Sequence, residues 1–510
     1  MSFTALVFCT VALASPFAAH AAPAPALLLK KNSDLPITAF NLTFRVGSAD
    51  DPAELAGLAN MTARMLREGG VQATKVGGAA MPARTRAELE EFMFPLAADI
   101  EVSSETEQVS FRATSSAADA RTVFNVLVQM LTAPAFSPAE FDRLKAEETD
   151  ALTKQLPRED EEELGKAALT QKMYGLNHPY SHVTTGSVSG LKALTLDRVK
   201  AFYKTHFTRQ RLTVALAGVV SPELARLAKS SFAGLAMGTS SRTQIAAPVE
   251  TGEQTLTIVK GPFDATGVHI GAPLPINRGS RDFPDMYLAA QAFGKHRSFV
   301  GRLMKSVREV RGLNYGTYAY VENFPGGGTR LTEPTQVART DQAFTLWARP
   351  TPHENGCFLL RQTYRELVNL ATDGLSKAEF DLTQSHLIGN APLLATGLER
   401  RLGYAIDSDF YGIKGDYLVS LQSRAKAAKL AQVNELLHKY LHPKKMAIVV
   451  VTRDPEAFKK QIMGERCDIH YGNGVEKPPE VLAEDKIIAT YPLGLKDENI
   501  HIVTSESIFE

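Results

Sequence analysis

The sequence predicts an α+β protein made of two homologous units, because two of its regions recur at a separation of a little under half the chain. The segment SPAEFDRL, residues 137–144, recurs as SKAEFDLT, residues 376–383, and each copy should open a helix with a Ser-x-x-Glu capping box. Residues 196–218 recur as residues 430–451, and each copy reads as an amphipathic helix, a short polar turn and an apolar β-strand. One duplicated unit of helices and strands accounts for both repeats.

The first unit spans residues 26–236. Its opening strand is predicted at residues 37–46, ITAFNLTFRV, where side chains alternate between two faces. A turn follows at residues 47–52 and a helix at residues 54–68. Within GLANMTARMLREGG, residues 57–70, apolar side chains recur at helical spacing, so the helix should bury one face. That face consists of Leu58, Met61, Met65 and Leu66.

The second unit spans residues 254–454 and follows a polar, Ser/Thr-rich linker at residues 237–253. It opens with a strand predicted at residues 254–259. Beyond it lies a tail, residues 455–510. The Pro/Glu-rich stretch of residues 476–484 predicts that part of this tail is an extended segment laid over a surface.

The most specific local pattern of the second unit is GRLMKSVREVRGLNYGTYAYVENF, residues 301–324. It reads as a helix rich in basic residues that breaks at Gly312 into a strand of alternating aromatic residues. Three glycines follow at residues 326–328, and they most simply form a mobile turn before a strand at residues 343–349. A glycine loop that contacts substrate is the alternative interpretation.

These features resemble the insulinase/pitrilysin family of metallopeptidases, the inverzincins, over residues 28–454. Family members typically carry Leu-Arg-Glu-x-Arg-Gly-Leu-x-Tyr in the second lobe, with an Arg and a Tyr seven residues apart that hold the backbone of the peptide substrate. In this chain the pair is Arg308 and Tyr315. The sequence His-Pro-Tyr at residues 178–180 also fits the first-lobe pattern of the family.

The same resemblance identifies a zinc motif without its metal ligands. The family's metal-binding helix typically reads Gly-Leu-x-His-x-x-Glu-His-Met, and its glycine, leucine and methionine are present in this chain. The first His, the Glu and the second His are replaced by Asn60, Ala63 and Arg64. A carboxamide is a poor zinc ligand, a methyl group cannot act as a base, and a guanidinium carries a fixed positive charge. An ordinary amphipathic helix explains this segment equally well by itself.

The resemblance implies two α+β lobes, each a mixed sheet with helices packed on one side, that together form half of a clamshell. It also implies a non-catalytic, substrate-binding subunit of a zinc peptidase that cleaves peptides. In some members of the family one chain carries the zinc motif and the other carries the Arg/Tyr pair. We therefore expect no metal and no cofactor in this chain. Its partner would be a zinc-bearing sister chain, or a second copy of itself in a self-dimer. The peptide would bind by adding a strand to the edge of a sheet.

Two other functions remain open. The chain could be a structural scaffold, as are the core subunits of respiratory complexes that resemble this family and lack zinc. It could also be a self-sufficient hydrolase with an unrecognised metal site. Arg308 and Tyr315 could then be a simple packing or cation–π contact.

Other metal ligands are weakly indicated. Glu147 or Glu148 lies near the position of the family's distal zinc ligand, but a solvated helix face is the favoured interpretation of the segment KAEETD. His178 and His182 are four residues apart, which is a helical ligand spacing, but Pro179 lies between them and no acid is close in sequence. Among sequence motifs, we find no nucleophile elbow, phosphate loop or dinucleotide fingerprint.

Composition favours proteins or peptides as partners. The chain has 510 residues, 56 acidic residues and 56 Lys and Arg, so the balance of charge favours neither nucleic acid nor an anionic membrane surface. Outside the N-terminal leader, the sequence lacks an apolar run of the roughly 18 residues that a membrane span requires.

The N-terminal leader predicts export. Residues 1–21 resemble a secretory signal peptide cleaved after Ala21, which would place the mature protein in the periplasm or outside the cell; an Ala/Pro-rich leader without that role is the alternative. Cys357 and Cys467 would be the two cysteines of the mature chain. They could pair outside the cytosol, or they could be two unrelated buried thiols.

Overall fold

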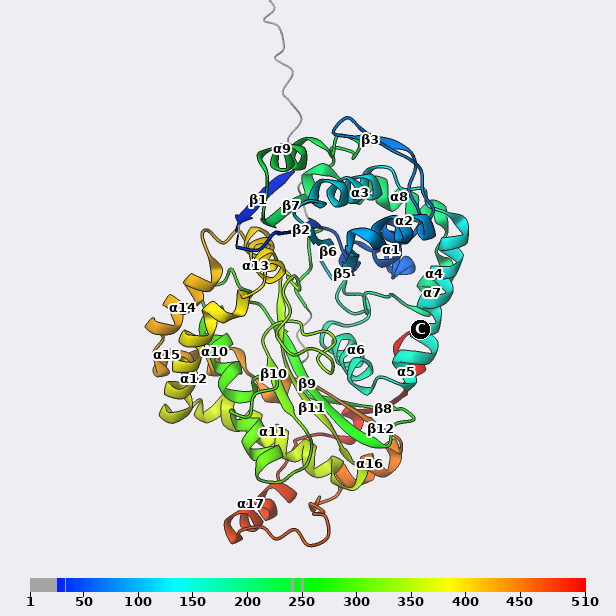
Figure 1. Cartoon of the computed structure of the whole chain (residues 1–510). Coiled ribbons are helices and arrows are strands. Elements are labelled where there is room, and N and C mark those ends of the chain that lie inside the picture. The colour runs from blue at the N-terminus through cyan, green and yellow to red at the C-terminus, as the bar shows by residue number, and fades with distance from the viewer. Residues whose placement is uncertain (1–24, 33, 240–242, 249–251) are drawn as a thin grey trace, which may run out of the picture.

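A computed structural model describes residues 25–32, 34–239, 243–248 and 252–510 (Figure 1). The predicted signal peptide lies outside these residues, as does part of the predicted linker. Two mixed β-sheets form two lobes, and both are flanked by helices. The predicted α+β class and the predicted duplication are confirmed by the arrangement of these sheets.

The first sheet has five strands in the order β1-β7-β2-β6-β5. Strand β1 pairs parallel with β7, and the remaining pairs are antiparallel. The strands are β1 Ala26–Lys31, β2 Ile37–Phe44, β5 Ile100–Ser104, β6 Val109–Ser116 and β7 Leu212–Gly218, and a separate hairpin is formed by β3 Thr74–Val76 and β4 Ala79–Met81. The predicted opening strand is therefore β2, and the edge strand β1 precedes it.

The second sheet repeats this order and adds one strand. Its order is β10-β11-β9-β12-β8-β13, so that β8, β12, β9, β11 and β10 correspond in turn to β1, β7, β2, β6 and β5. Strand β8 pairs parallel with β12, as β1 does with β7, and β13 pairs parallel with β8 on its outer edge. The strands are β8 Thr255–Lys260, β9 Ala265–Leu274, β10 Thr317–Tyr320, β11 Gln342–Pro352, β12 Ala447–Thr452 and β13 Ile500–Thr504.

Helices cover both faces of each sheet. The helices before the linker are α1 Leu58–Glu68, α2 Arg86–Met93, α3 Ala120–Thr132, α4 Pro138–Asp150, α5 Leu156–Arg158, α6 Glu161–Tyr174, α7 Val188–Ala193, α8 Leu196–His206 and α9 Pro222–Ser230. Those after it are α10 Phe283–Gly294, α11 Gly356–Asp373, α12 Lys377–Asn390, α13 Leu398–Tyr411, α14 Tyr417–Ala427, α15 Leu430–Tyr440, α16 Pro455–Met463 and α17 Pro479–Ala489.

The two lobes exchange one helix each. Helix α13 of the second lobe packs against β7 and β2 of the first sheet, and helix α6 of the first lobe packs against β9 and β12 of the second. Strand residues alternate between these contacts and their own lobe's core. Ala215 and Ala217 of β7 contact α13, whereas Val214 and Leu216 join the core of the first lobe. Each sheet is therefore covered by its own lobe's helices on one face, as expected, and by a helix of the neighbouring lobe on the other.

Helix α1 begins four residues later than predicted. Residues 53–55 form a short 3-10 turn, and Gly57 then adopts a left-handed backbone with φ of 100°. The carboxylate of Asp51 accepts hydrogen bonds from the backbone N–H of Gly57 at 2.8 Å and of Ala59 at 2.7 Å. The helix begins where this carboxylate satisfies its free amides.

Only one of the two predicted capping boxes forms. Ser376 and Glu379 make both hydrogen bonds of the box at the start of α12. At the start of α4 the side chain of Ser137 makes no capping bond. The carboxylate of Glu140 instead pairs with Arg143 at 2.6 Å and with Arg86 at 3.3 Å.

The tail is more structured than the sequence indicated. Residues 479–484 belong to α17, so the prediction of an extended segment is wrong there. Farther on, β13 extends the second sheet. A disulfide joins Cys357 of α11 to Cys467 at the start of this region, which decides between the two alternatives for these cysteines.

No helix among residues 25–510, apart from the short stretches not described, combines the length and the apolar character that crossing a bilayer requires.

Candidate functional site

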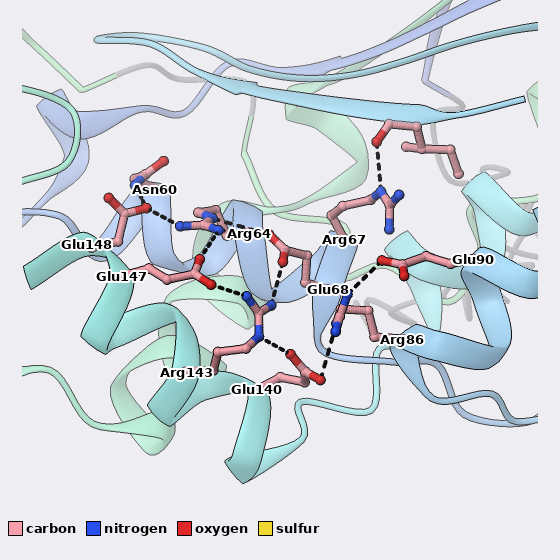
Figure 2. Close-up of polar contacts among 11 residues, drawn as sticks. Asn60, Arg64, Arg67, Glu68, Arg86, Glu90, Glu140, Arg143, Glu147 and Glu148 are labelled. Carbon is pink, nitrogen blue, oxygen red and sulfur yellow. Dashed lines mark hydrogen bonds and ion pairs between the residues drawn. The ribbon is translucent and has the colours of Figure 1, made fainter. Parts of the chain in front are cut away.

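The helix that carries the degenerate zinc motif is held by its apolar face. Leu58, Met61, Met65 and Leu66 are buried, as predicted. Ala63 is also fully buried, and its methyl group packs in the core of the first lobe. Asn60 and Arg64 lie one turn apart on α1 and are partly exposed, and both turn toward α4 (Figure 2).

Glu148 on α4 is the partner of both positions. Its Oε1 accepts a hydrogen bond from Asn60 Nδ2 at 3.0 Å and another from Arg64 Nη1 at 2.7 Å. Only 7% of Glu148 is exposed, so the expectation of a solvated helix face is wrong for this residue. It holds for the neighbouring Glu147, whose side chain is 46% exposed. The two positions that replace zinc ligands thus converge on one buried carboxylate.

Further ion pairs extend this contact into a network between α1, α2 and α4 (Figure 2). Arg64 also pairs with Glu147 at 2.8 Å and with Glu68 at 3.1 Å. Arg143 joins Glu68, Glu140 and Glu147 from the other side. We call these charged residues the α1–α4 ion network, which consists of Arg64, Glu68, Arg86, Glu90, Glu140, Arg143, Glu147 and Glu148.

The network keeps its groups charged. Burial opposes ionisation of Glu147, but the hydrogen bonds from Arg64 and Arg143 outweigh it and lower the pKa of this carboxyl. In the same way, burial would lower the pKa of Arg64, but Glu148 and Glu147 raise it above its ordinary value. The guanidinium of Arg64 therefore remains a permanent cation against Glu148.

These residues do not fit a zinc ion. Structural and catalytic zinc sites in proteins use Cys, His, Asp or Glu in a tetrahedral set. Here one carboxylate, one carboxamide and one guanidinium meet, and the guanidinium brings the positive charge itself. Within the described part of the chain, no group of three His, Cys, Asp or Glu side chains lies together in a way that could hold a metal ion.

In the structure, the side chains of His178 and His182 have different partners and do not converge on a common position for a metal ion. His178 is buried, its Nε2 lies 2.9 Å from the carbonyl oxygen of Ala246, and its Nδ1 accepts a hydrogen bond from the Tyr180 N–H. His182 Nε2 instead lies 3.7 Å from Asp51 Oδ2. The His-Pro-Tyr segment is a packing element, in which the Tyr180 hydroxyl donates to the buried Glu107.

Arg308 and Tyr315 lie side by side at the surface of the second lobe. The guanidinium carbon of Arg308 is 4.2 Å from the centre of the Tyr315 ring, and Tyr315 is 72% exposed. Arg308 lies on a π-helix, η6 Met304–Glu309, rather than on the α-helix expected, and Tyr315 lies in the loop before β10 rather than on the strand. Among the described residues, no carboxylate pairs with Arg308, and its guanidinium Nη1 lies 4.0 Å from Met304 Sδ.

A third residue belongs to this pair, and the sequence did not indicate it. The ring of Phe299 lies on Arg308 at 4.8 Å from the guanidinium carbon and is 65% exposed. Arg308 is thus stacked on two exposed aromatic rings, a contact that guanidinium groups favour. Phe299 precedes the recognisable motif, so the spacing of Arg308 and Tyr315 could not identify it.

The three glycines after Phe324 form a turn that is attached to α6. The N–H of Gly326 donates to Glu163 Oε1 at 2.9 Å, and Lys166 Nζ donates to the carbonyl oxygen of Phe324 at 2.7 Å. Burial raises the pKa of Glu162, although Lys166 beside it opposes this. The turn therefore has fixed contacts to the first lobe at its first glycine.

Two family models match the chain. "Insulinase (Peptidase family M16)" matches residues 27–179, and "Peptidase M16 inactive domain" matches residues 193–387. Among curated proteins, the chain is similar to the non-peptidase homolog YmxG of Helicobacter pylori, with 21% identity over 429 residues, 84% of this chain and 91% of that protein.

Solved structures share this fold. The chain superposes on a peptidase M16 inactive domain from Pseudomonas fluorescens with a TM-score of 0.71 and 24% identity, covering 84% of this chain and 95% of that one. It superposes on the periplasmic protease PqqL from Escherichia coli with a TM-score of 0.65 and 14% identity, covering 90% of this chain. It spans 49% of PqqL, about half of that protein.

Proposed function

Because this chain belongs to the insulinase family, peptidase family M16, and to its members without the zinc motif, we propose that it is the substrate-binding subunit of a zinc peptidase complex. In this proposal it pairs with a zinc-bearing sister chain that cleaves peptides. The observation that carries the proposal is the contrast between two sites. Arg64 and Glu148 neutralise each other where a metal would bind, whereas Arg308 is partly exposed beside Tyr315 and has no carboxylate partner among the described residues.

Arg308 and Tyr315 would bind a peptide carbonyl. A guanidinium presents several N–H donors in one plane, and the contact of Arg308 with two aromatic rings leaves donors at its edge for a ligand. The tyrosine hydroxyl adds a further donor. Donors placed in advance at a carbonyl stabilise the negative charge that develops there during attack. The zinc centre of the sister chain would supply the activated water.

The peptide backbone would add to a sheet edge. Strand β5 is the last strand of the first sheet, and Arg67 on α1 donates from Nε to the Ile100 carbonyl oxygen at 2.7 Å, which fixes the start of the strand. An exposed edge strand offers unpaired N–H and C=O groups to an extended peptide. This edge lies beside α1, so a peptide bound there would pass the degenerate zinc position.

Export to the periplasm or to the outside is part of the proposal. The disulfide between Cys357 and Cys467 supports it, because disulfides persist mainly in oxidising compartments.

The proposed substrate-binding role must be tested on the complex of this chain with its zinc-bearing sister chain. The tagged chain should be used to capture a His-x-x-Glu-His protein from the native source, and the recombinant pair should then be assayed on unstructured peptides. Arg308→Ala and Tyr315→Phe should each lower kcat/KM by about 10²-fold or more without changing assembly, because each removes a donor at the reacting carbonyl. Arg466→Gln, which removes an exposed Arg paired with Asp468, serves as the matched control and should leave kcat/KM unchanged.

The alternatives predict different results. A scaffold without peptide contact would give a complex whose kinetics do not respond to Arg308→Ala or Tyr315→Phe. A self-sufficient hydrolase would cleave peptides as the isolated chain, and a chelator would stop it. Zinc content and peptidase activity of the isolated chain therefore come first.

A further inference from the structure

The chain's own C-terminal residues occupy a site on the first lobe. After β13 has paired with β8, the Ser505 N–H donates to the Lys260 carbonyl oxygen at 3.0 Å, and the chain turns toward α6 and α7. Ile508 and Phe509 are then buried in the core of the first lobe, with 5% and 2% of their surfaces exposed. Figure 1 shows this last segment, in red, beside α5 and α7.

Helices α6 and α7 bind the backbone of this segment. The N–H of Val188, the first residue of α7, donates to the Phe509 carbonyl oxygen at 2.7 Å. Gln171 of α6 donates to the Ile508 carbonyl oxygen. The Ser189 hydroxyl donates to a backbone oxygen of Glu510 at 2.7 Å. The site therefore holds a strand, then two apolar side chains, then the backbone of an acidic residue.

The internal duplication provides a second copy of this site. Strand β1 corresponds to β8, α13 to α6 and α14 to α7, and α6 and α13 both end in Tyr-Gly. Strand β1 ends its sheet, so among the described residues no strand lies where β13 would pair. Beside it, between the end of β1, α13 and the N-terminus of α14, is a cavity of about 370 Å³. The place that the tail fills in one half of the molecule is thus a cavity in the other half.

The cavity combines positive charge with aromatic surface. Lys30 and Lys31 of β1 and Arg401 of α13 line it, together with the largely buried rings of Tyr404 and Tyr417. The acid that lines it is Asp416, and its carboxylate already accepts hydrogen bonds from the N–H groups of α14 at residues 418 and 419. The N–H of Tyr417, the first residue of α14, is the counterpart of the Val188 N–H that binds the tail.

We propose that this cavity and the free edge of β1 bind an extended, acidic segment of a second polypeptide. The segment would pair parallel with β1, place two apolar side chains against Tyr404 and Tyr417, and bring its carboxylates to Lys30, Lys31 and Arg401. The lining favours an acidic guest. Its cations are Lys30, Lys31 and Arg401, whereas the carboxylate of Asp416 already accepts hydrogen bonds from α14. The guest comes from another polypeptide because this chain's own tail is held in the first lobe.

The probe is a synthetic peptide with this chain's own tail sequence, IHIVTSESIFE, labelled with fluorescein at its amino end and titrated onto the full-length protein. Fluorescence anisotropy should show saturable binding. The double variant Lys30→Glu/Lys31→Glu should weaken this binding about tenfold or more, because it reverses the charges that meet the guest's carboxylates. The control Lys426→Glu/Lys429→Glu makes the same change in net charge on exposed lysines near the far end of α14, and should leave the affinity unchanged.

The position of the bound peptide separates the cavity from the tail's own site. A photoreactive benzoylphenylalanine in place of the peptide's phenylalanine should cross-link to α13 or α14. Cross-links only to α6 or α7 would mean that the probe displaces the tail, and they would overturn the proposal. The same holds for absent binding, and for binding that responds equally to both double variants.

Discussion

At the scale of single residues, the contact between α1 and α4 depends on which group supplies the positive charge beside Glu148. A buried Glu148 in the first lobe requires a positive partner, since an unpaired buried carboxylate is strongly destabilising. In the zinc-bearing members of the family a metal ion would supply that charge, and here the guanidinium of Arg64 does so at 2.7 Å. The charge of this buried carboxylate is therefore compensated by the protein itself.

This geometry predicts that zinc binding can be introduced. The side chains at positions 60 and 64 already reach the same oxygen of Glu148, so Asn60→His/Arg64→His should create a set of two His and one Glu. We expect about one zinc per chain after dialysis, measured by mass spectrometry of the metal content, and a rise in Tm on adding zinc.

The third ligand provides the control for this variant. Adding Glu148→Gln to the double variant should abolish zinc uptake, whereas Glu147→Gln should not. Failure of Asn60→His/Arg64→His to take up zinc while it remains folded would show that the positions converge only through the length of the arginine side chain.

The sequence predicted part of this site and not the rest. Asn60, Ala63 and Arg64 follow from a motif with fixed spacing. The choice between Glu147 and Glu148 does not, because both are on one helix and only packing against α1 decides which of them is buried. Phe299 lies outside the Arg308–Tyr315 motif, and only the fold brings it within 4.8 Å of Arg308.

At the scale of elements, periodicity located the strands and helices that repeat. It failed at the ends of the chain, where elements depend on distant partners. Strand β13 alternates weakly and is exposed at several positions, and it is a strand because β8 offers an edge. Helix α17 begins at a Pro-rich stretch that composition alone assigns to extended structure, although proline is well suited to the first turn of a helix.

The last two apolar residues should stabilise the first lobe from a distant part of the sequence. Phe509→Ala should lower the free energy of unfolding by up to about 3 kcal/mol, at the low end for a buried Phe because the chain end can move away. Urea unfolding followed by circular dichroism measures this. Leu482→Ala, at a residue that is 44% exposed on α17, is the control and should change stability by less than about 0.5 kcal/mol. Equal effects of the two changes would contradict a role for the tail in the first core.

At the scale of the whole molecule, the lobes are joined by exchanged helices and by buried polar contacts. Gln336 of the second lobe contacts Asn41, Thr43 and Ser110 of the first sheet. The carboxylate of Glu107, in the turn between β5 and β6, accepts hydrogen bonds from the N–H and the hydroxyl of Thr340. Such contacts need fixed geometry on both sides, so they hold the two lobes to one another.

The same turn should make stability depend on pH. Burial raises the pKa of Glu105 to about 7, although Arg339 and Arg330 of the second lobe lower it in part. Between its ordinary value and about 7, the folded protein holds a proton that the unfolded chain has lost, so stability falls as pH rises through this window. Glu105→Gln removes the charge, and should make the protein more stable than the parent at pH 8 by about 1–3 kcal/mol but similar to it at pH 4.5.

Urea unfolding of both proteins at several pH values from 4.5 to 8 tests this. Glu101→Gln is the matched control, because Glu101 lies on the same hairpin with a side chain that is 69% exposed and should leave the pH dependence of the parent intact. If Glu105→Gln also leaves it intact, Glu105 is ionised throughout this range and the junction tolerates its charge. If Glu105→Gln flattens the dependence while Glu101→Gln does not, the junction between the lobes holds a neutral carboxyl group, and alkaline conditions loosen the molecule there first.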